Sequence, residues 1–230
     1  MSASDSVKSL QKRRGARRRA EPASLKERVR PAPPTSGRGA VTYEKLMLAA
    51  GELLGEVGFE RLTTNAICAR AKLTPPALYR YFDDKYEILA ELGRRLLKRQ
   101  YEAYAIWLFE GGVKSDPDDQ IENLARWFAI AARIVEEEPG AVWTLRAMRA
   151  LPNMSEVRLE SQRLFTNQMF EYYKRILPDV DPELLWHRLR IRAEFGFVVD
   201  EMAIEQTEIP RDVLFREAAR ILSRSLSDAR

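Results

Sequence analysis

The feature that most restricts the fold of this chain is the spacing of its apolar residues from Thr42 onward. Apolar residues three and four positions apart share one face of an α-helix, whereas a half-buried strand needs strict alternation. In the segment 42–57 one such helical face is formed by Leu46, Ala50, Leu53, Leu54 and Val57. Every later long segment has the same period and none shows sustained alternation, so we expect an all-α fold.

Capping and breaking residues mark where the helices begin and end. Asp116 and Asp181 each precede a proline, which suits an N-cap followed by the first helical position. Gly58 and the pair Gly111-Gly112 suit helix ends, because glycine favours left-handed backbone and weakens a helix interior. These signals predict nine helices, at about residues 42–57, 64–70, 75–81, 85–109, 117–137, 140–150, 154–176, 182–206 and 211–227.

Residues 1–40 differ from the rest of the chain in composition. They hold eleven Lys and Arg residues against three acidic ones, a balance of +8, so the remainder of a chain with net charge +4 carries −4. Apolar periodicity is absent and Ser, Pro, Gly and Arg dominate, which predicts a disordered basic arm. Such an arm suits DNA phosphates or a minor groove. An inert tail and a mitochondrial transit peptide are the alternatives.

The residues that the chain lacks argue against several function classes. Its single cysteine, Cys68, cannot form an intramolecular disulfide, and with one histidine, His187, no Cys/His zinc cluster can be assembled. There is no G-x-S-x-G, no phosphate-binding glycine loop and no metal-ligand spacing, so we expect no enzyme, no metal and no cofactor. No apolar run of membrane length and no secretory signal are present, which favours a cytoplasmic protein without a membrane partner.

Residues 63–82 have the layout of a helix-turn-helix. A threonine would cap the first short helix, and Thr74 would cap the second, with proline in the first turn, where a missing N–H costs little. Leu73 would fill the gap between the two helices. Leu78 and Phe82 lie four apart and would point inward. The residues left available to a DNA groove are Pro75, Pro76, Ala77, Tyr79, Arg80 and Tyr81.

This stretch resembles the DNA-binding region of the TetR family of bacterial repressors, from about Leu46 to Leu89. The family has a Gly-aromatic turn, a Thr-Thr cap and a Leu-Tyr-x-x-Phe-x-x-Lys ending. These are matched by Gly58-Phe59, Thr63-Thr64, Leu78-Tyr79-Arg80-Tyr81-Phe82 and Lys85. Lys72 departs from the usual turn glycine, so we expect it to adopt a strained conformation or to shift the turn. Cys68 stands where alanine is usual, and we expect a small core residue rather than a redox sensor.

The resemblance implies which residues contact DNA. Base edges would be read by Pro75, Pro76, Ala77 and Arg80. Only Arg80 has a side chain that can make a bidentate contact to guanine. Phosphates would be met by Thr64, Tyr79, Tyr81 and Lys85, with Thr42 or Tyr43 adding a contact from the first helix. The alternative for Tyr79 and Tyr81 is ordinary packing.

The resemblance also implies a two-domain plan, with DNA bound by residues 41–90 and with ligand binding and dimerisation in residues 91–230. A cavity among the helices between residues 117 and 206 would hold the ligand, although ordinary core packing explains the aromatic residues equally well. The candidate lining residues are Trp107, Trp127, Phe128, Trp143, Phe165 and Phe170. The last two helices would form a four-helix bundle with a second copy. Their stripes are Phe195, Val198, Val199 and Met202, then Leu214, Ala218, Ile221 and Leu222.

These features together predict a ligand-responsive, DNA-binding transcriptional regulator. Repression is the family default: a homodimer on a near-palindromic double-stranded DNA operator would be released when a small apolar effector binds. The helix 85–109 would transmit the change, because it begins against the second helix of the motif and ends in the ligand-binding domain. The alternative is a helical interaction module that does not bind DNA and whose basic arm seeks a membrane.

Overall fold

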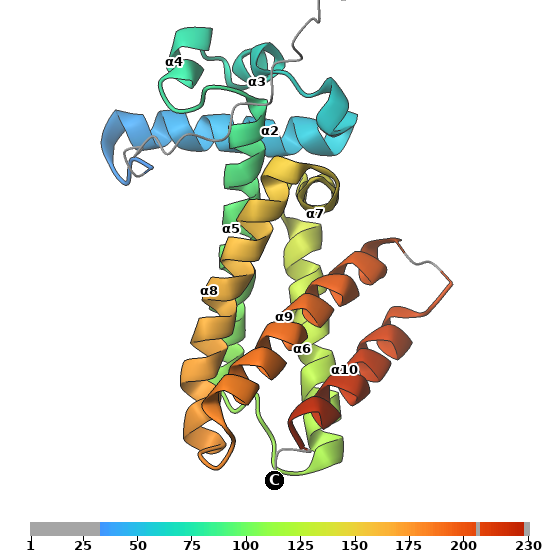
Figure 1. Cartoon of the computed structure of the whole chain (residues 1–230). Helices are drawn as coiled ribbons and strands as arrows, with labels where there is room; N and C mark the ends of the chain where they lie inside the picture. Colours follow the sequence, from blue (N-terminus) through green and yellow to red (C-terminus); the bar gives the residue numbers. More distant parts are fainter. Residues whose placement is uncertain (1–32, 206–207, 228–230) are drawn as a thin grey trace, which may run out of the picture. The chain divides into compact units, whose positions relative to one another are not determined.

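The computed structural model describes residues 33–205 and 208–227, and side chains as far as residue 224. Within these ranges all regular structure is helical, which confirms the all-α prediction (Figure 1). The nine helices of the described residues are α2 (Gly37–Arg61), α3 (Thr64–Ala71), α4 (Pro75–Tyr79), α5 (Lys85–Phe109), α6 (Pro117–Glu137), α7 (Ala141–Ala150), α8 (Pro152–Ile176), α9 (Pro182–Glu205) and α10 (Arg211–Ser227). None of them is long and apolar enough to cross a membrane.

The helix boundaries follow the capping signals. The carboxylate of Asp116 accepts hydrogen bonds from two backbone N–H groups of the first turn of α6, at 2.9 and 3.0 Å. Asp84 does the same for α5. The first helix is the exception, because it begins at Gly37 and not at Thr42. Residues 37–40, which were expected to belong to the arm, are therefore helical, and residues 1–32 of the predicted arm lie outside the described residues.

Gly58 interrupts α2 as the sequence predicts. Its backbone has φ 72° and ψ 173°, a conformation that side-chain-bearing residues rarely adopt. A Cβ atom built at Gly58 would lie 3.2 Å from the indole of Trp143, so little room is left for a side chain. The last turn of α2, ending at Arg61, continues beyond this break.

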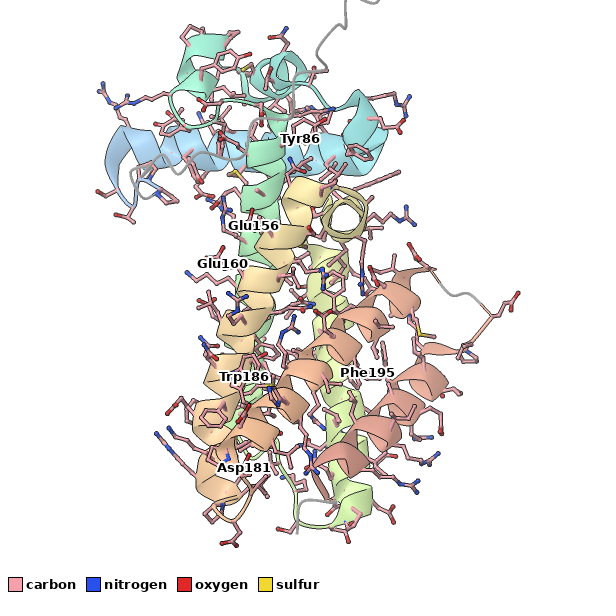
Figure 2. All side chains as sticks on the ribbon, in the orientation of Figure 1. Tyr86, Glu156, Glu160, Asp181, Trp186 and Phe195 are labelled. Atoms are coloured by element: carbon pink, nitrogen blue, oxygen red, sulfur yellow. The ribbon has the colours of Figure 1, made fainter. Side chains whose placement is uncertain are left out.

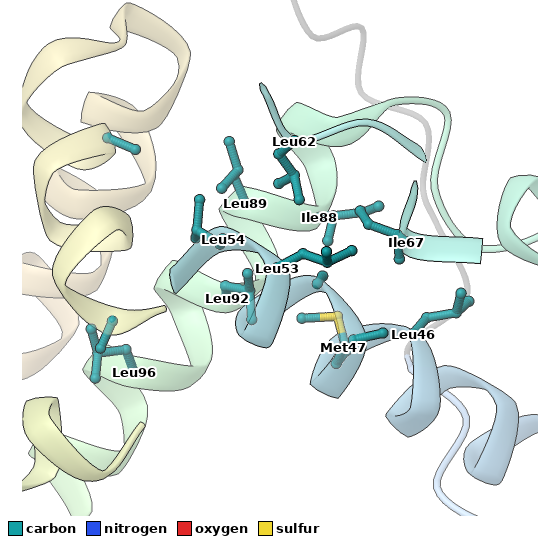
Figure 3. Packing of buried hydrophobic residues seen from close by; sticks show 14 of the residues in the cluster. Leu46, Met47, Leu53, Leu54, Leu62, Ile67, Ile88, Leu89, Leu92 and Leu96 are labelled. Atoms are coloured by element: carbon teal, nitrogen blue, oxygen red, sulfur yellow. The ribbon is translucent and has the colours of Figure 1, made fainter. Parts of the chain in front are cut away.

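The first hydrophobic cluster joins α2, α3 and α4 to the beginning of α5. Leu46 and Leu54 of α2, Ile67 of α3 and Ile88 and Leu89 of α5 are fully buried in it. Figure 3 shows how these side chains converge from three helices on one centre. The cluster extends to α7, so the start of α5 is fixed on several sides.

A second hydrophobic cluster lies among the far half of α5, α6, α8, α9 and α10. Helix α10 packs mainly against α6, and α8 packs against α9 (Figure 1). Tyr104 of α5, Trp127 of α6 and Leu189 of α9 are buried there. Since α5 contributes to both clusters, it joins the helix-turn-helix to the remaining helices.

Candidate nucleic-acid interface and internal cavity

Backbone hydrogen bonds hold the connection between α3 and α4. The hydroxyl of Thr63 caps α3 by accepting from the backbone N–H of Ala66 at 3.1 Å. Lys72 takes the left-handed conformation, with φ 55° and ψ 43°. It is the one non-glycine residue with positive φ in the described part of the chain, so the strain predicted at this position is confirmed. Cys68 is buried nearby, as predicted.

The predicted side-chain cap at Thr74 is wrong, because its hydroxyl makes no capping hydrogen bond. An N-cap side chain normally accepts from the second or third residue of the helix. Here the second residue is Pro76, which has no N–H, and the N–H of the third, Ala77, donates to the Thr74 carbonyl at 2.9 Å. Helix α4 therefore begins through the fixed φ of its two prolines.

Helix α4 turns an apolar side inward and leaves its other side to solvent. Leu78 is 0% exposed and Phe82 is 4% exposed, as predicted. The guanidinium of Arg80 lies 5.9 Å from the centre of the Tyr81 ring and makes no ion pair with a described carboxylate. The outer side consists of Pro75, Pro76, Tyr79 and Arg80, with Ala77 and Tyr81 half-buried at its edge.

Tyr79, the last residue of α4, and Tyr81, two residues further on, differ in how accessible their hydroxyls are to a phosphate. Tyr79 is 51% exposed, and its hydroxyl lies 3.3 Å from that of Thr64. The two candidate phosphate contacts are thus neighbours on one surface. The hydroxyl of Tyr81 donates to the carbonyl of Gly39 at 3.3 Å, and that of Thr42 donates to the carbonyl of Arg38. Packing alone therefore does not account for Tyr79.

The structure contradicts the choice of Tyr43 as a phosphate contact. Its side chain is 4% exposed, and its ring stacks on Phe82 with the ring centres 5.3 Å apart. Burial and a hydrogen bond to the Glu91 carboxylate raise the pKa of the Tyr43 hydroxyl. Tyr43 precedes Leu46 by three positions and Met47 by four, so the helical period places it on the buried face of α2.

Lys85 has a structural role in the described conformation. Its ammonium donates to the carbonyls of Phe59 at 2.9 Å and Glu60 at 3.3 Å. These carbonyls belong to the last turn of α2, where helical N–H partners run out. One of the three ammonium hydrogens remains for another acceptor. The phosphate contact of Lys85 thus stays a prediction, and replacing Lys85 would also loosen the join between α2 and α5.

A cavity of about 70 Å³ lies between α5, α6, α8 and α9. Its wall is largely aromatic. Tyr101 stacks on Phe165 with ring centres 4.4 Å apart, and Tyr104 meets Trp127 edge-on at 4.9 Å. The space accommodates about two water molecules, so a drug-sized ligand would have to displace side chains.

Half of the aromatic residues predicted for the cavity line it. These are Trp127, Phe128 and Phe165. Trp107 is not part of the cavity wall, although its ring centre lies 6.1 Å from that of Trp127. The helix range expected for the cavity, 117–206, omitted α5, which supplies several lining residues, and included α7, which supplies none of those described.

The assignments of Trp143 and Phe170 to the cavity are wrong. Trp143 is on α7, and its indole packs over Gly58 of α2. Phe170 is on α8 outside the cavity wall, with the Lys174 ammonium 5.5 Å from its ring centre. Aromatic character alone does not indicate the direction in which a helix presents a side chain.

Sequence reasoning missed the polar side chains of the cavity. Asp200 on α9 is 8% exposed and accepts a hydrogen bond from Nε2 of Gln100 at 2.8 Å. The pKa of Asp200 is raised to about 7, chiefly by burial and also by the nearby Glu201, while the hydrogen bond from Gln100 acts in the opposite direction. The signal that could have found this residue is an acid directly after the apolar run Phe197-Val198-Val199, since buried acids require compensation.

Part of the predicted dimer interface belongs instead to the core of the chain itself. Val199, Leu214 and Leu222 are 5% to 7% exposed. Helix α10 packs the side that carries Leu214 and Leu222 against α6, where the ring centres of Phe215 and Phe128 lie 6.3 Å apart. Their assignment to a contact between copies is wrong, because helical spacing identifies a buried face but not the partner that covers it.

The other predicted interface residues remain accessible. Phe195, labelled on α9 in Figure 2, is 47% exposed. Val198 on α9 is 39% exposed, and Ile221 on α10 is 62% exposed. Met202 and Ala218 are half-buried. The exposed apolar surface of α9 and α10 also includes Leu184, Ile191 and Val213.

A second connection joins the helix-turn-helix to the cavity helices. Gly140, between α6 and α7, has φ 74° and packs its backbone on α2. A Cβ atom built at Gly140 would lie 2.5 Å from the carbonyl oxygen of Gly51, and one at Gly51 would lie 2.7 Å from the carbonyl oxygen of Pro139. The turn at Gly140 is therefore a connection between these regions in addition to helix α5.

Comparison with known sequences identifies the region that carries the motif. The profile described as "Bacterial regulatory proteins, tetR family" matches residues 46–92. The chain is 41% identical over 56 residues to the tetracycline repressor protein class G of Vibrio anguillarum, a match that covers 24% of this chain and 27% of that relative. It is 28% identical over 148 residues to the HTH-type transcriptional regulator BetI of Stenotrophomonas maltophilia (strain R551-3), which covers 63% and 74% of the two chains.

Comparison with solved structures extends the likeness to the other helices. A tetR-family transcriptional regulator from Streptomyces coelicolor matches with a TM-score of 0.59, at 15% sequence identity and over 82% of both chains. At this identity the likeness concerns the fold.

Proposed function

Because this chain belongs to the TetR family of bacterial regulatory proteins, and is therefore a DNA-binding transcriptional regulator, we propose that it is a homodimeric repressor released from a near-palindromic operator by a small effector. The proposal assigns DNA binding to residues 41–90 and effector binding and dimerisation to residues 91–230, without catalysis. The observation that carries it is the outer side of α4, where Arg80 stands beside Pro75, Pro76 and Ala77.

This side has the chemistry that a major groove requires. A guanidinium can donate two hydrogen bonds to O6 and N7 of guanine, and proline and alanine offer apolar contact to a thymine methyl. Tyr79 and Thr64 present neighbouring hydroxyls that would donate to phosphate oxygens and fix the register. We assign base reading to Arg80 and positioning to Tyr79.

Replacing Arg80 is the experiment that tests this assignment. In Arg80→Ala, the preference for the correct base at one position of each half-site should fall by about 1 to 3 kcal/mol, which weakens binding to the operator. Affinity for random DNA should change little. Tyr79→Phe should weaken binding to the operator and to random DNA by the same factor. Operator fragments selected from a random duplex library, followed by fluorescence anisotropy at fixed salt, give both affinities.

Arg70→Ala is the matched control for the charge. It removes the same cation from α3, but the Arg70 guanidinium is held by the Glu56 carboxylate at 2.7 Å and is not expected to read a base. If Arg80→Ala lost equal affinity for the operator and for random DNA, Arg80 would have to be reassigned from a base contact to a phosphate contact. Failure of the wild type to enrich any sequence would overturn the proposed function itself.

We place the contact between two copies on the exposed apolar surface of α9 and α10, defined by Ile191, Phe195, Val198, Val213 and Ile221. A two-fold contact buries the same surface on both copies, and these side chains are 39% to 62% exposed among the described residues. Dimerisation supports DNA binding because two reading helices about 34 to 36 Å apart match successive half-sites.

Phe195→Glu should convert the dimer to a monomer at micromolar concentration, because two carboxylates would be buried in an apolar contact. Sedimentation velocity measures the change, and affinity for the two-half-site operator should fall with it. Ile130→Glu is the control: Ile130 is 42% exposed on α6, outside the proposed contact, so this variant should remain dimeric. A monomeric wild type, or a dimeric Phe195→Glu, would contradict the assignment.

Two connections support a coupling between the cavity and the DNA-binding helices. Helix α5 carries Gln100 and Tyr104 of the cavity and begins next to α4. The turn at Gly140 ends α6, which carries Trp127 and Phe128, and lies on α2. A ligand that enlarges the cavity would shift both, and such coupling is typically worth about 1 to 3 kcal/mol.

A further inference from the structure

The cavity walls contain several aromatic rings in contact with one another. Tyr104 touches three other rings, with centres 5.3 Å from that of Trp107, 4.9 Å from Trp127 and 4.8 Å from Phe165. Tyr101 lies parallel to Phe165, at an interplanar angle of 7°. Such faces bind flat apolar groups and also attract cations through their π electrons.

Asp200 is an acid within this wall that has no cation of its own. Its carboxylate accepts a hydrogen bond from Gln100, an uncharged amide, at 2.8 Å. No Lys or Arg of the described residues forms a salt bridge with it, although Glu194 on the same helix is bound by both Arg158 and Arg190 at 2.7 Å. Burying an ionised acid without a cation is costly, so a cation bound at this cavity would stabilise the charged form of Asp200.

The one buried cation of the cavity wall is engaged elsewhere. Arg192 is 7% exposed, and its guanidinium donates to the main-chain carbonyl of Leu222 in α10. The Arg192 guanidinium therefore helps to hold α10 against α9. The cavity thus presents a carboxylate rather than a guanidinium as its available charge.

A larger groove adjoins the cavity and could serve as a route of entry for a ligand. A groove of about 670 Å³ runs between α5 and α8 on the outside of the bundle. Tyr101, Tyr104 and Met169 line both the groove and the cavity and so form the wall between them. The Tyr101 hydroxyl has no hydrogen-bond partner among the described residues, so its ring can rotate without breaking a hydrogen bond to any of them.

We propose that the effector is an organic cation, a flat aromatic body carrying one protonated or quaternary nitrogen, with the nitrogen bound against the Asp200 carboxylate and the body between Tyr101, Tyr104, Trp127 and Phe165. This inference rests on the proposed function, because it names the ligand class of the same cavity. It differs from the small apolar effector expected from the sequence by one positive charge. The bound cation would supply the positive partner that the Asp200 carboxylate lacks. The aromatic rings would supply the apolar contact.

Three naphthalene compounds of nearly equal size test the charge preference. They are 1-naphthylmethylamine, which is protonated at pH 8, the neutral 1-naphthylmethanol and the anionic 1-naphthoate. Isothermal titration calorimetry of the full-length protein at pH 8 should show the amine binding at least about tenfold more tightly than either of the others. In Asp200→Asn this preference should disappear, and in the control Glu205→Gln it should persist, because Glu205 is exposed on the same helix and pairs with Arg146.

The proposal is overturned by an alcohol or naphthoate that binds as tightly as the amine, by an amine preference that survives in Asp200→Asn, or by absence of amine binding at millimolar concentration. Circular dichroism of each variant verifies folding. Selection of duplex DNA by the same protein separates the two claims. Amine binding through Asp200 without DNA selection would support the cation site and contradict the repressor, and the reverse result would contradict the cation site alone.

Discussion

Asp200→Asn is expected to raise the melting temperature of the protein by roughly 5 to 10 °C at pH 8, and to change it little near pH 4. Asp200 has its pKa raised from 3.8 to about 7 by burial. Between pH 3.8 and about pH 7, the folded chain therefore holds a proton on Asp200 that the unfolded chain has released. Stability is full below about pH 4 and falls as the pH rises to about 7, by at most about 4 kcal/mol. Asparagine has no charge to bury and avoids this loss.

Thermal unfolding of wild type and variant from pH 4 to pH 8 gives the measurement, with Glu205→Gln as control. Glu205 is an exposed carboxylate on the same helix, so its removal should leave the pH dependence of the melting temperature unchanged. The groups that face Asp200 are Gln100, Tyr101 and Glu201, none of which is a cation at neutral pH. An Asp200→Asn variant that is less stable than wild type at pH 8 would show that the carboxylate is compensated by a partner.

Gly140→Ala is expected to lower the free energy of unfolding by about 2 to 4 kcal/mol. The added Cβ would lie 2.5 Å from the carbonyl oxygen of Gly51 and 3.1 Å from Cβ of Leu54, so the backbones of α2 and of the turn must separate. Alanine also resists the positive φ of 74° at this position. The cost combines an overpacked contact with a strained backbone conformation.

Gly55→Ala provides the matched control on the same interface. Its Cβ would meet the backbone nitrogen of Gly140 at 3.6 Å, an ordinary contact, and alanine in a helix interior adds stability of about 0.5 to 1 kcal/mol. Urea denaturation of both variants should therefore give changes of opposite sign. A Gly140→Ala variant as stable as wild type would mean that the turn does not press on α2, and the second route of coupling would have to be withdrawn.

The helix pattern could be predicted from the sequence because its signals are local. Asp116 and Pro117 define the start of α6, and α5 ends at Phe109, just before the glycine pair. The inward position of Leu78 and Phe82 followed from their spacing. The start of α2 at Gly37 was missed, because the segment before Thr42 has the composition of a linker and no recognisable N-cap hydrogen bond.

The parts that could not be predicted depend on contacts between distant helices. The period of α10 correctly marks Leu214 and Leu222 as a buried face, but only the tertiary packing shows that α6 covers it. The same limit applies to Trp143, an aromatic residue directed at α2 rather than at the cavity. The pairing of Gln100 with Asp200 spans 100 residues, and no local pattern indicates it.

The most direct test of the central claim, sequence-specific DNA binding by α4, is one equilibrium competition. Full-length protein is titrated with a duplex selected from a random library and with the same duplex after both half-sites are scrambled, at physiological salt and with anionic vesicles added. We expect the protein to bind the selected duplex at least about a thousandfold more tightly than the scrambled one, with or without the vesicles. Equal affinity for the two duplexes, or displacement of the selected duplex by the vesicles, would contradict it and favour a basic module that binds anionic surfaces without reading DNA.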